Sequence, residues 1–354
     1  MKTLRVLVVD DSASNRNTLG EILESCTGVD VVGHAANGSQ ALRLAAEFHP
    51  DLITLDLEMP RMDGFTFLRL LMASQPTPVV VISSYPAKDN VFRALELGAL
   101  DFIAKPEVNA QGAVAGSAEQ LKAQLDGMLE VVRQLSAPGR QARKPFSKPP
   151  IVAPTPGPFN AIGMPNPVIA IAASTGGPTA LMELFARLPP TGLGALVVAQ
   201  HMPERFTRTF AERLDKQSSF RVREAEPTLE LSPHSAVLCP GGRCLELERR
   251  GERLITRVVK RGPDDRYAPS ADRLFSSVAK AVGERAVAVV LTGMGDDAAR
   301  GVVAIKEAGG RVLCESEATA VVYGMPRVAV QTGCVDEVLP LRELVARVRE
   351  LVSS

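Results

Sequence analysis

A serine at the end of a predicted strand is the first candidate for chemistry in this sequence. Residues 168–172, V-I-A-I-A, form an apolar run typical of a buried strand, and Ser174 follows after one further alanine. After Thr175, two glycines leave open space around the hydroxyl before a helix-like pattern begins. A hydroxyl attacks an acyl carbon only when a base removes its proton. Ser174 is therefore a candidate nucleophile, provided that a base lies beside it.

Histidine is the usual general base, and one histidine stands in a suitable position. His201 follows the next predicted strand, 194–199, after one intervening residue. Neighbouring parallel strands place their carboxyl ends side by side, so His201 is expected to meet Ser174. The other three belong to the first half of the chain or to a turn-rich segment, and they are His34, His49 and His234.

A carboxylate at a third strand end is expected to orient the imidazole. The strand predicted at 286–291 is followed by T-G-M-G-D-D-A, which supplies Asp296 and Asp297. Sequence position alone leaves both of them open. The backbone N–H groups of Met294 and Gly295, together with those of Thr175 and its neighbour Gly176, are candidates to stabilise an oxyanion.

The same glycine-rich turn permits a different interpretation. Gly293-x-Gly295-x-x-Ala298 matches a dinucleotide-binding fingerprint, and Glu315 ends the next predicted strand, where a ribose-binding acid would lie. The two aspartates in this turn, however, would repel a pyrophosphate. The alternative hypothesis is a signalling protein whose second half binds a nucleotide or has no catalytic role.

The first half of the chain collects carboxylates at strand ends. Asp10 and Asp11 follow the first predicted strand, Asp56 ends the third, and Lys105 follows the fifth. Converging carboxylates repel one another unless a cation such as Mg²⁺ neutralises their charge. Mg²⁺ also binds phosphoryl oxygens. Lys105 can pair with a carboxylate or with a phosphoryl group on it, and Ser83, at the end of the fourth strand, can bond the same group.

Alternating apolar and amphipathic segments must position these residues. In both halves they predict a parallel sheet covered by helices, so the fold class is α/β with two doubly wound domains. The first is flavodoxin-like, and the second is Rossmann-like and three-layered, with hairpins inserted at about 220–260. A proline-rich stretch is expected to act as a linker, which gives the domains 1–136 and 168–354 and the linker 137–167. The strands are predicted at 4–9, 29–33, 51–56, 78–83 and 101–104, and then at 168–172, 194–199, 286–291 and 311–314.

Composition excludes several classes of protein. Lys and Arg total 40, as do Asp and Glu, so the net charge is zero, and a nucleic-acid partner is not expected. The first apolar run is too short for a signal peptide, and no run is long enough to span a bilayer. The five cysteines form no C-x-x-C pair and are expected to be reduced thiols in a cytoplasmic protein.

The first half resembles the receiver domain of two-component response regulators. The motifs that carry the resemblance are D-D (10–11), D-L-E-M-P-x-M-D-G (56–64), V-I-S-S (81–84) and K-P (105–106). The resemblance implies that Asp56 accepts phosphate from a histidine kinase. It also implies that Asp11, Asp56 and the carbonyl of Glu58 hold Mg²⁺ with help from Asp10, and that Phe102 occupies the aromatic switch position.

The second half is similar to the catalytic domain of chemotaxis protein-glutamate methylesterases, the CheB family. The matching motifs are A-S-T-G-G-P (173–178), Q-H-M-P-x-x-F-T-x-x-F-A-E-R-L (200–214), P-G-G (240–242), P-S-A-D-R-L-F-x-S-V-A (269–279), L-T-G-M-G-x-D (291–297) and Y-G-M-P (323–326). The resemblance implies a triad of Ser174, His201 and Asp297, with Met294 in the oxyanion hole.

The implied reaction is hydrolysis of glutamyl methyl esters on the cytoplasmic part of chemoreceptors, with release of methanol and without a cofactor. Glutamine deamidation is implied as a second activity. The resemblance also implies a regulatory mechanism, in which the unphosphorylated receiver packs over the Ser174 edge and phosphorylation uncovers it.

Three positions depart from the family pattern. Ala172 stands where glycine is common, Asp296-Asp297-Ala298 replaces Asn-Asp-Gly, and Tyr267 stands where histidine is often found. The extra charge of Asp296 would oppose an anionic substrate.

Overall fold

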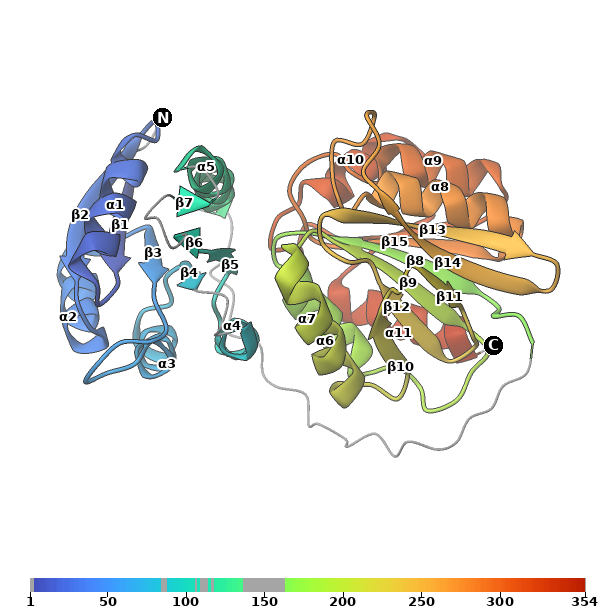
Figure 1. The fold of residues 1–354 in the computed structure, drawn as a ribbon, viewed down its shortest axis with the longest axis horizontal. Coiled ribbons are helices and arrows are strands. Elements are labelled where there is room, and N and C mark those ends of the chain that lie inside the picture. Colours follow the sequence, from blue (N-terminus) through green and yellow to red (C-terminus); the bar gives the residue numbers. More distant parts are fainter. Residues whose placement is uncertain are drawn as a thin grey trace. The chain divides into compact units, whose positions relative to one another are not determined.

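The computed structural model describes residues 3–83, 88–105, 107–108, 114–115, 118–135 and 163–353. The chain divides into two compact units, Met1–Ser147 and Lys148–Ser354, and each is described by itself (Figure 1). Residues 137–162, which make up most of the expected linker, lie outside the described residues. Asn166 and Pro167, at the end of that linker, already hydrogen-bond to Leu193 and Ala195 of the second unit.

The first unit alternates strands and helices. Its strands are β1 (Leu4–Val9), β2 (Val29–Ala35), β3 (Leu52–Leu55), β4 (Val79–Ser83), β5 (Asp101–Ala104), β6 (Glu107–Val108) and β7 (Val114–Ala115). Its helices are α1 (Ala13–Glu24), α2 (Gly38–Phe48), α3 (Gly64–Ser74), α4 (Lys88–Glu96) and α5 (Ala118–Leu135).

The five-stranded parallel sheet of this unit has the order β2-β1-β3-β4-β5. The strand order reverses at β1, so a crevice is expected beyond its carboxyl end, where Asp10 and Asp11 lie. Alternate side chains of β1 pack with α1 and α5 in one apolar core that includes Val6, Leu23 and Leu125.

The second unit is larger. Its strands are β8 (Val168–Ala173), β9 (Ala195–Gln200), β10 (Arg221–Glu224), β11 (Thr228–Glu230), β12 (Ser235–Leu238), β13 (Arg243–Arg250), β14 (Arg253–Lys260), β15 (Ala286–Val290), β16 (Arg311–Glu315) and β17 (Glu337–Leu339). Its helices are α6 (Gly177–Phe185), α7 (Glu204–Gln217), α8 (Ala271–Val282), α9 (Ala299–Glu307), α10 (Met325–Gln331) and α11 (Leu341–Ser353), with a 3₁₀ turn η2 (Gly283–Arg285).

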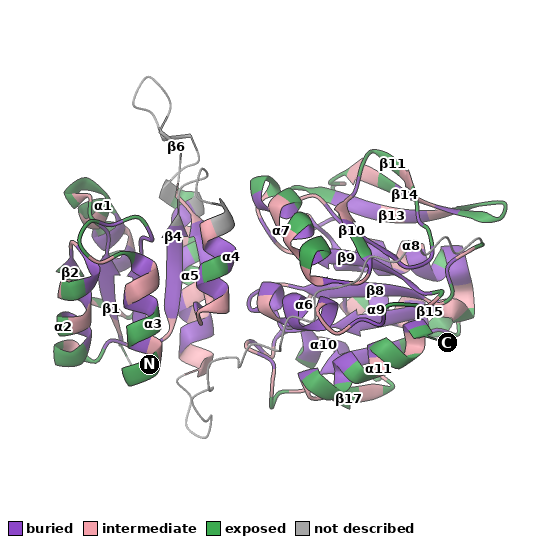
Figure 2. Cartoon of the chain, turned by 90° about the horizontal axis from the view of Figure 1, so that it is seen from below, coloured by how far each residue is buried: buried purple, intermediate pink, exposed green. Residues whose placement is uncertain are grey.

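Seven parallel strands form the central sheet of the second unit, in the order β10-β12-β9-β8-β15-β16-β17. Helices α8, α9 and α10 lie on one face, and α6, α7 and α11 lie on the other (Figure 1). Both faces of β8 and β9 are therefore buried along their whole length (Figure 2). The strand order reverses at β8, which puts the expected crevice at Ser174. The sequence-based prediction of two doubly wound α/β domains is confirmed.

The prediction of inserted hairpins at 220–260 is only partly correct. β13 and β14 do form a hairpin, and β11 joins them in an antiparallel sheet. β10 and β12, however, pair in parallel with each other, and β12 pairs with β9, so both extend the main sheet. Their partners lie far away in the sequence, whereas the local turn residues suggested hairpins. The short edge strand β17 was not predicted.

Two further expectations concern the membrane and the cysteines. Within the described ranges, no helix combines the length and apolar character needed to cross a bilayer. All five cysteines are free thiols, and four of them are buried. Burial raises the pKa of the Cys314 thiol to about 12, so this side chain remains protonated and acts as a small apolar group in the core.

Candidate functional site

Ser174 stands at the carboxyl end of β8, between the strand and α6. Its backbone N–H donates to Thr292 O (3.0 Å), and its carbonyl accepts from Gly177 N (2.7 Å). The residue is half-buried, whereas the strand before it and the residues 175–178 after it are buried. The hydroxyl therefore stands at the rim of the sheet on a backbone that is fixed from both sides.

Two glycines explain why the chain can make this turn. Gly176 has φ +76°, a left-handed conformation that side-chain-bearing residues rarely adopt. A Cβ on Gly293 would lie 2.8 Å from the Ser174 Cβ and 2.5 Å from Met325 Sδ. The glycine at 293 thus lets the neighbouring loop approach the serine directly.

His201 lies beside Ser174 because of strand register. Ala173 of β8 pairs with Gln200 of β9, and the His201 N–H donates to Ala173 O (2.9 Å). The next residue of each strand, serine and histidine, therefore occupies the same rim. The imidazole donates from Nε2 to Asp297 Oδ2 at 2.8 Å. Its other ring nitrogen, Nδ1, is then the one available to accept a proton.

Asp297 is fixed at the N-terminus of α8. Its carboxylate accepts from the backbone N–H groups of Ala271 (2.7 Å) and Asp272 (3.0 Å), in addition to His201. Burial raises the pKa of Asp297, but the His201 contact and these N–H donors outweigh burial and bring it below the ordinary value. The residue is thus an ionised acceptor aimed at the imidazole.

Asp296 has different partners, although it is the neighbour of Asp297. Its carboxylate accepts from Arg266 Nη1 (2.6 Å) and from the Tyr267 hydroxyl (3.0 Å). The negative charge of Asp296, which the sequence suggested would oppose an anionic substrate, is therefore paired with the positive charge of Arg266. Of the two aspartates that the sequence left open, Asp297 is the one that contacts His201.

The candidate oxyanion donors line the same rim. Met294 and Gly295 are half-buried in the loop that follows β15, and Thr175 follows the serine. Among the residues that the structure describes, none accepts a hydrogen bond from the backbone N–H of Met294, Gly295 or Thr175. They are therefore available to a ligand at the end of β8.

Gln200 was not singled out by the sequence, yet it joins the segments that carry Ser174 and His201. It is 1% exposed, and its Nε2 donates to both Ser174 O and His201 O at 3.0 Å. The sequence carries no signal for this role beyond a glutamine directly before the histidine. The amide holds the serine and histidine backbones at a fixed separation.

Glu315 does not lie in a position to bind ribose. Its carboxylate is 1% exposed and accepts from the backbone N–H of Thr292 (2.8 Å). The Thr292 hydroxyl in turn donates to Thr175 O (2.9 Å). The acid that the nucleotide hypothesis required is thus used inside the fold, where it supports the loop around Ser174.

The acidic cluster of the first unit gathers three carboxylates. Oxygens of Asp10, Asp11 and Asp56 lie within 4.8 Å of one another, and Lys105 Nζ contacts Asp10 (2.8 Å) and Asp56 (2.5 Å). Burial raises the pKa of Asp56, and although Lys105 opposes this, the pKa stays above its ordinary value. The donors are all hard oxygens, so the cluster fits a cation such as Mg²⁺.

The remaining predicted residues of the first unit surround this cluster. The Glu58 N–H donates to Asp56 Oδ1 (3.4 Å), which brings the backbone of Glu58 beside the cluster. Ser83 pairs with Ala104 at the ends of β4 and β5, but its side chain lies outside the described residues. Phe102 is 7% exposed and packs edge-on against Phe92, with ring centroids 6.2 Å apart.

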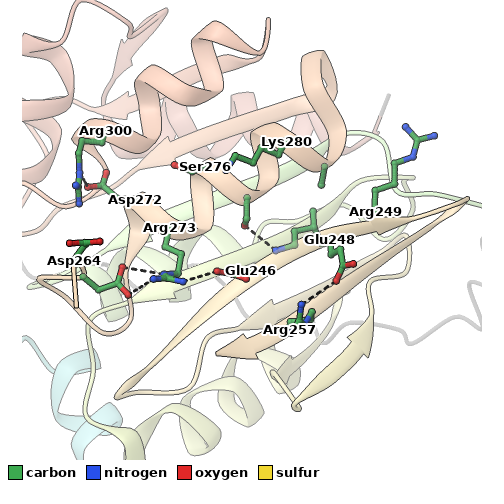
Figure 3. A pocket seen from close by; sticks show the side chains of 14 residues that line it. Glu246, Glu248, Arg249, Arg257, Asp264, Asp272, Arg273, Ser276, Lys280 and Arg300 are labelled. Carbon is green, nitrogen blue, oxygen red and sulfur yellow. Dashed lines mark hydrogen bonds and ion pairs between the residues drawn. The ribbon is translucent and has the colours of Figure 1, made fainter. Parts of the chain in front are cut away.

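A charged groove of about 680 Å³ lies between α8 and the β13–β14 hairpin (Figure 3), and neither Ser174 nor His201 is among the residues that line it. Its charges are largely paired within the chain, as in the contacts of Arg273 with Glu246 (2.8 Å) and Asp265 (2.7 Å). No group in it resembles a nucleophile with a base. The groove is therefore not the candidate reactive site.

Comparison with protein families gives two matches along the chain. Residues 169–348 match the family described as CheB methylesterase, and residues 6–113 match the response regulator receiver domain. The two matches correspond to the two units of the fold.

Similar proteins match over nearly the full length. A protein-glutamate methylesterase/protein-glutamine glutaminase from Anaeromyxobacter dehalogenans is 48% identical, over 99% of this chain and 96% of its own. One from Geobacter sulfurreducens is 43% identical, over 98% of each chain. The crystal structure of the Thermotoga maritima CheB methylesterase catalytic domain is 34% identical, with a TM-score of 0.51, and covers 53% of this chain and 99% of that one.

Proposed function

Because the chain belongs to the CheB methylesterase family and carries a receiver domain before the esterase domain, we propose that it is a chemoreceptor-modifying hydrolase. The second unit would hydrolyse glutamyl methyl esters on chemoreceptors and release methanol. It would also hydrolyse receptor glutamines to glutamates with release of ammonia, since the relatives are named protein-glutamine glutaminases. The chemistry needs no cofactor, and we propose a cytoplasmic location, where both receptor segments and kinases are accessible.

The first half of the reaction uses Ser174, His201 and Asp297. Ser174 Oγ attacks the ester carbonyl while His201 accepts its proton at Nδ1. Asp297 keeps the Nε2 proton in place and stabilises the imidazolium. The backbone N–H groups of Met294, Gly295 and Thr175 would donate to the oxyanion of the tetrahedral intermediate.

The second half regenerates the serine. His201 returns its proton to the departing methoxide, so methanol leaves and an acyl-serine remains. Water then attacks the acyl carbon, and the imidazole takes a proton from it. Collapse of the second intermediate frees the glutamate side chain and restores the Ser174 hydroxyl.

The first unit would regulate this activity by phosphorylation. Asp56 is the proposed phosphoacceptor, with a histidine kinase as donor, and Asp10, Asp11, Asp56 and the carbonyl of Glu58 would hold Mg²⁺. The cation would neutralise phosphoryl oxygens. Lys105 would contact the same phosphoryl group, and Ser83 and Phe102 would respond to it. Phosphorylation of Asp56 would then raise the rate of the esterase by shifting the population towards an accessible site.

One observation carries the proposal: the 2.8 Å hydrogen bond from His201 to the buried Asp297, at the strand end next to Ser174. A base oriented by an acid beside a nucleophilic serine is the arrangement that acyl transfer needs.

The test is methanol release from receptor membranes that carry methyl esters, measured before and after the addition of acetyl phosphate with Mg²⁺. Wild-type protein should release methanol, and the phosphodonor should raise the rate. Ser174→Ala should abolish release under both conditions. Equal release by the wild type and Ser174→Ala would disprove the serine mechanism, and an unchanged rate after phosphorylation would disprove the regulation.

A further inference from the structure

Tyr267 lies flat against the imidazole of His201. The ring centroids are 5.0 Å apart, and the ring planes differ by 7°. Tyr267 belongs to a loop before α8, which is remote in sequence from both β9 and Ser174. A histidine that must exchange protons therefore has an aromatic ring against one of its faces.

The hydroxyl of Tyr267 is fixed at the other end of the ring. It donates to Asp296 Oδ1 (3.0 Å), and Asp296 is in turn bonded to Arg266 (2.6 Å). Burial raises the pKa of Tyr267, and the neighbouring Asp296 raises it further, so the phenol stays protonated and remains a donor. Gly295 has φ +98°, and a Cβ there would lie 2.6 Å from the hydroxyl. A glycine at 295 is thus required for this contact.

The hydrogen bond to Asp297 and the stack constrain different motions of the imidazole. A single hydrogen bond at Nε2 fixes one atom but leaves the ring free to rotate about the axis through that atom. A parallel aromatic neighbour opposes this rotation, because tilting the imidazole would break the face-to-face contact. Both constraints together determine the direction in which Nδ1 points.

We propose that Tyr267 is a positioning residue for His201, and that Asp296 acts through it by anchoring the phenol. The inference rests on the proposed function, because it concerns the base of that reaction. Two positions at which the chain departs from the family pattern, Tyr267 and Asp296, then form one unit. The stacked ring face also favours the imidazolium that forms when Ser174 is deprotonated.

A double-mutant cycle tests the anchoring. Tyr267→Phe removes the hydroxyl, and Asp296→Ala removes its acceptor together with the exposed ion pair to Arg266, so each should lower kcat for methanol release about threefold, with KM unchanged. The double variant should be no slower than either single variant. Asp296→Asn should restore the lost rate, because its amide oxygen can still accept the phenolic proton. If the kcat losses of the two single variants multiply in the double variant, the two residues act independently and Asp296 does not anchor Tyr267.

Removal of the ring tests the stack itself. Tyr267→Leu should lower kcat about tenfold, since aromatic pairs contribute modestly beyond their burial, while the temperature of unfolding stays close to that of Tyr267→Phe. A loss of kcat that simply follows the loss of thermal stability would indicate a structural role only.

A measurement that does not depend on turnover separates this inference from the proposed function. ¹⁵N NMR of the histidine side chains reports exchange of the His201 Nε2 proton, assigned with His201→Gln. Exchange should be about tenfold faster in Tyr267→Leu than in the wild type, because the unstacked ring leaves its hydrogen bond more often. Unchanged exchange would overturn the inference. Faster exchange in a protein that releases no methanol would support the positioning role and reject the esterase.

Discussion

His201 bonds a carboxylate that is far less accessible than the imidazole itself. The Nε2–Oδ2 distance is 2.8 Å, and Asp297 keeps 1% of its side-chain surface exposed whereas His201 keeps 16%. Asp297 is thus inside the fold, at the N-terminus of α8, and only the imidazole reaches the rim. In the proposed reaction, this arrangement would hold the imidazole firmly and leave it accessible to substrate.

Replacement of the acid by an amide should nearly abolish the reaction. In Asp297→Asn the side chain loses its charge and can present an N–H to Nε2, which selects the wrong tautomer of His201. We expect kcat for methanol release to fall about a thousandfold, with the fold retained. The control is Asp296→Asn, whose carboxamide keeps the Tyr267 contact and should stay within about threefold of the wild type. The reverse order of effects would assign the orienting role to Asp296.

Acid should weaken folding through the same carboxylate. Burial raises the pKa of Asp297, but His201 and the N–H donors lower it below the value of an unfolded chain. A lowered folded pKa stabilises the protein above the unfolded pKa of about 4, and this stabilisation is lost as the pH falls through the folded pKa. Asp297→Asn lacks this titration. The difference in melting temperature between wild type and variant should therefore shrink from pH 5 to pH 3. A difference that stays constant over this range would show that Asp297 does not have a lowered pKa in the folded protein.

The position of the candidate site was largely predictable from the sequence because its residues lie at strand ends. Apolar runs marked β8, β9 and β15 to within a residue or two, and parallel strands end at one rim. That rule alone brought Ser174 and His201 together. It could not distinguish Asp296 from Asp297, because both follow the same strand, and only the position of the α8 N-terminus separates them.

Features that depend on long-range packing were not accessible from the sequence. Nothing local indicates that Gln200 bonds two backbone carbonyls or that Tyr267 stacks on His201. The strands β10 and β12 were missed as members of the main sheet for the same reason. Their short sequences resemble hairpin arms, and only pairing with β9 makes them parallel strands.

Gln200 offers a direct test of backbone positioning. Gln200→Met keeps the length of the side chain but removes the donor shared by Ser174 O and His201 O. Loss of a buried donor should cost about 1–3 kcal/mol of stability and lower kcat more than it changes KM. Calorimetry and methanol release measure the two effects. Wild-type values for both would show that the amide is dispensable.

The glycine at 293, beside Ser174, should not tolerate a methyl group. Gly293→Ala places a Cβ 2.8 Å from the Ser174 Cβ, so the serine or its loop must move. A displacement of this kind should lower kcat about a hundredfold. Gly127→Ala in α5 is the matched control, because a Cβ there meets nothing within 4 Å. Comparable kcat values for the two variants would contradict the close approach.

The acidic cluster should depend on Lys105 for stability. Its ammonium contacts both Asp10 and Asp56, whose side chains are only 3% and 12% exposed. Lys105→Met leaves two buried carboxylates without a cation, which should cost about 3 kcal/mol. Mg²⁺ should then raise the melting temperature more in the variant than in the wild type, because the bound cation replaces the missing charge. Lys122→Met removes a comparable but exposed pair with Asp126 and should change little. If Mg²⁺ stabilises Lys105→Met no more than the wild type, the three carboxylates do not form the cation site.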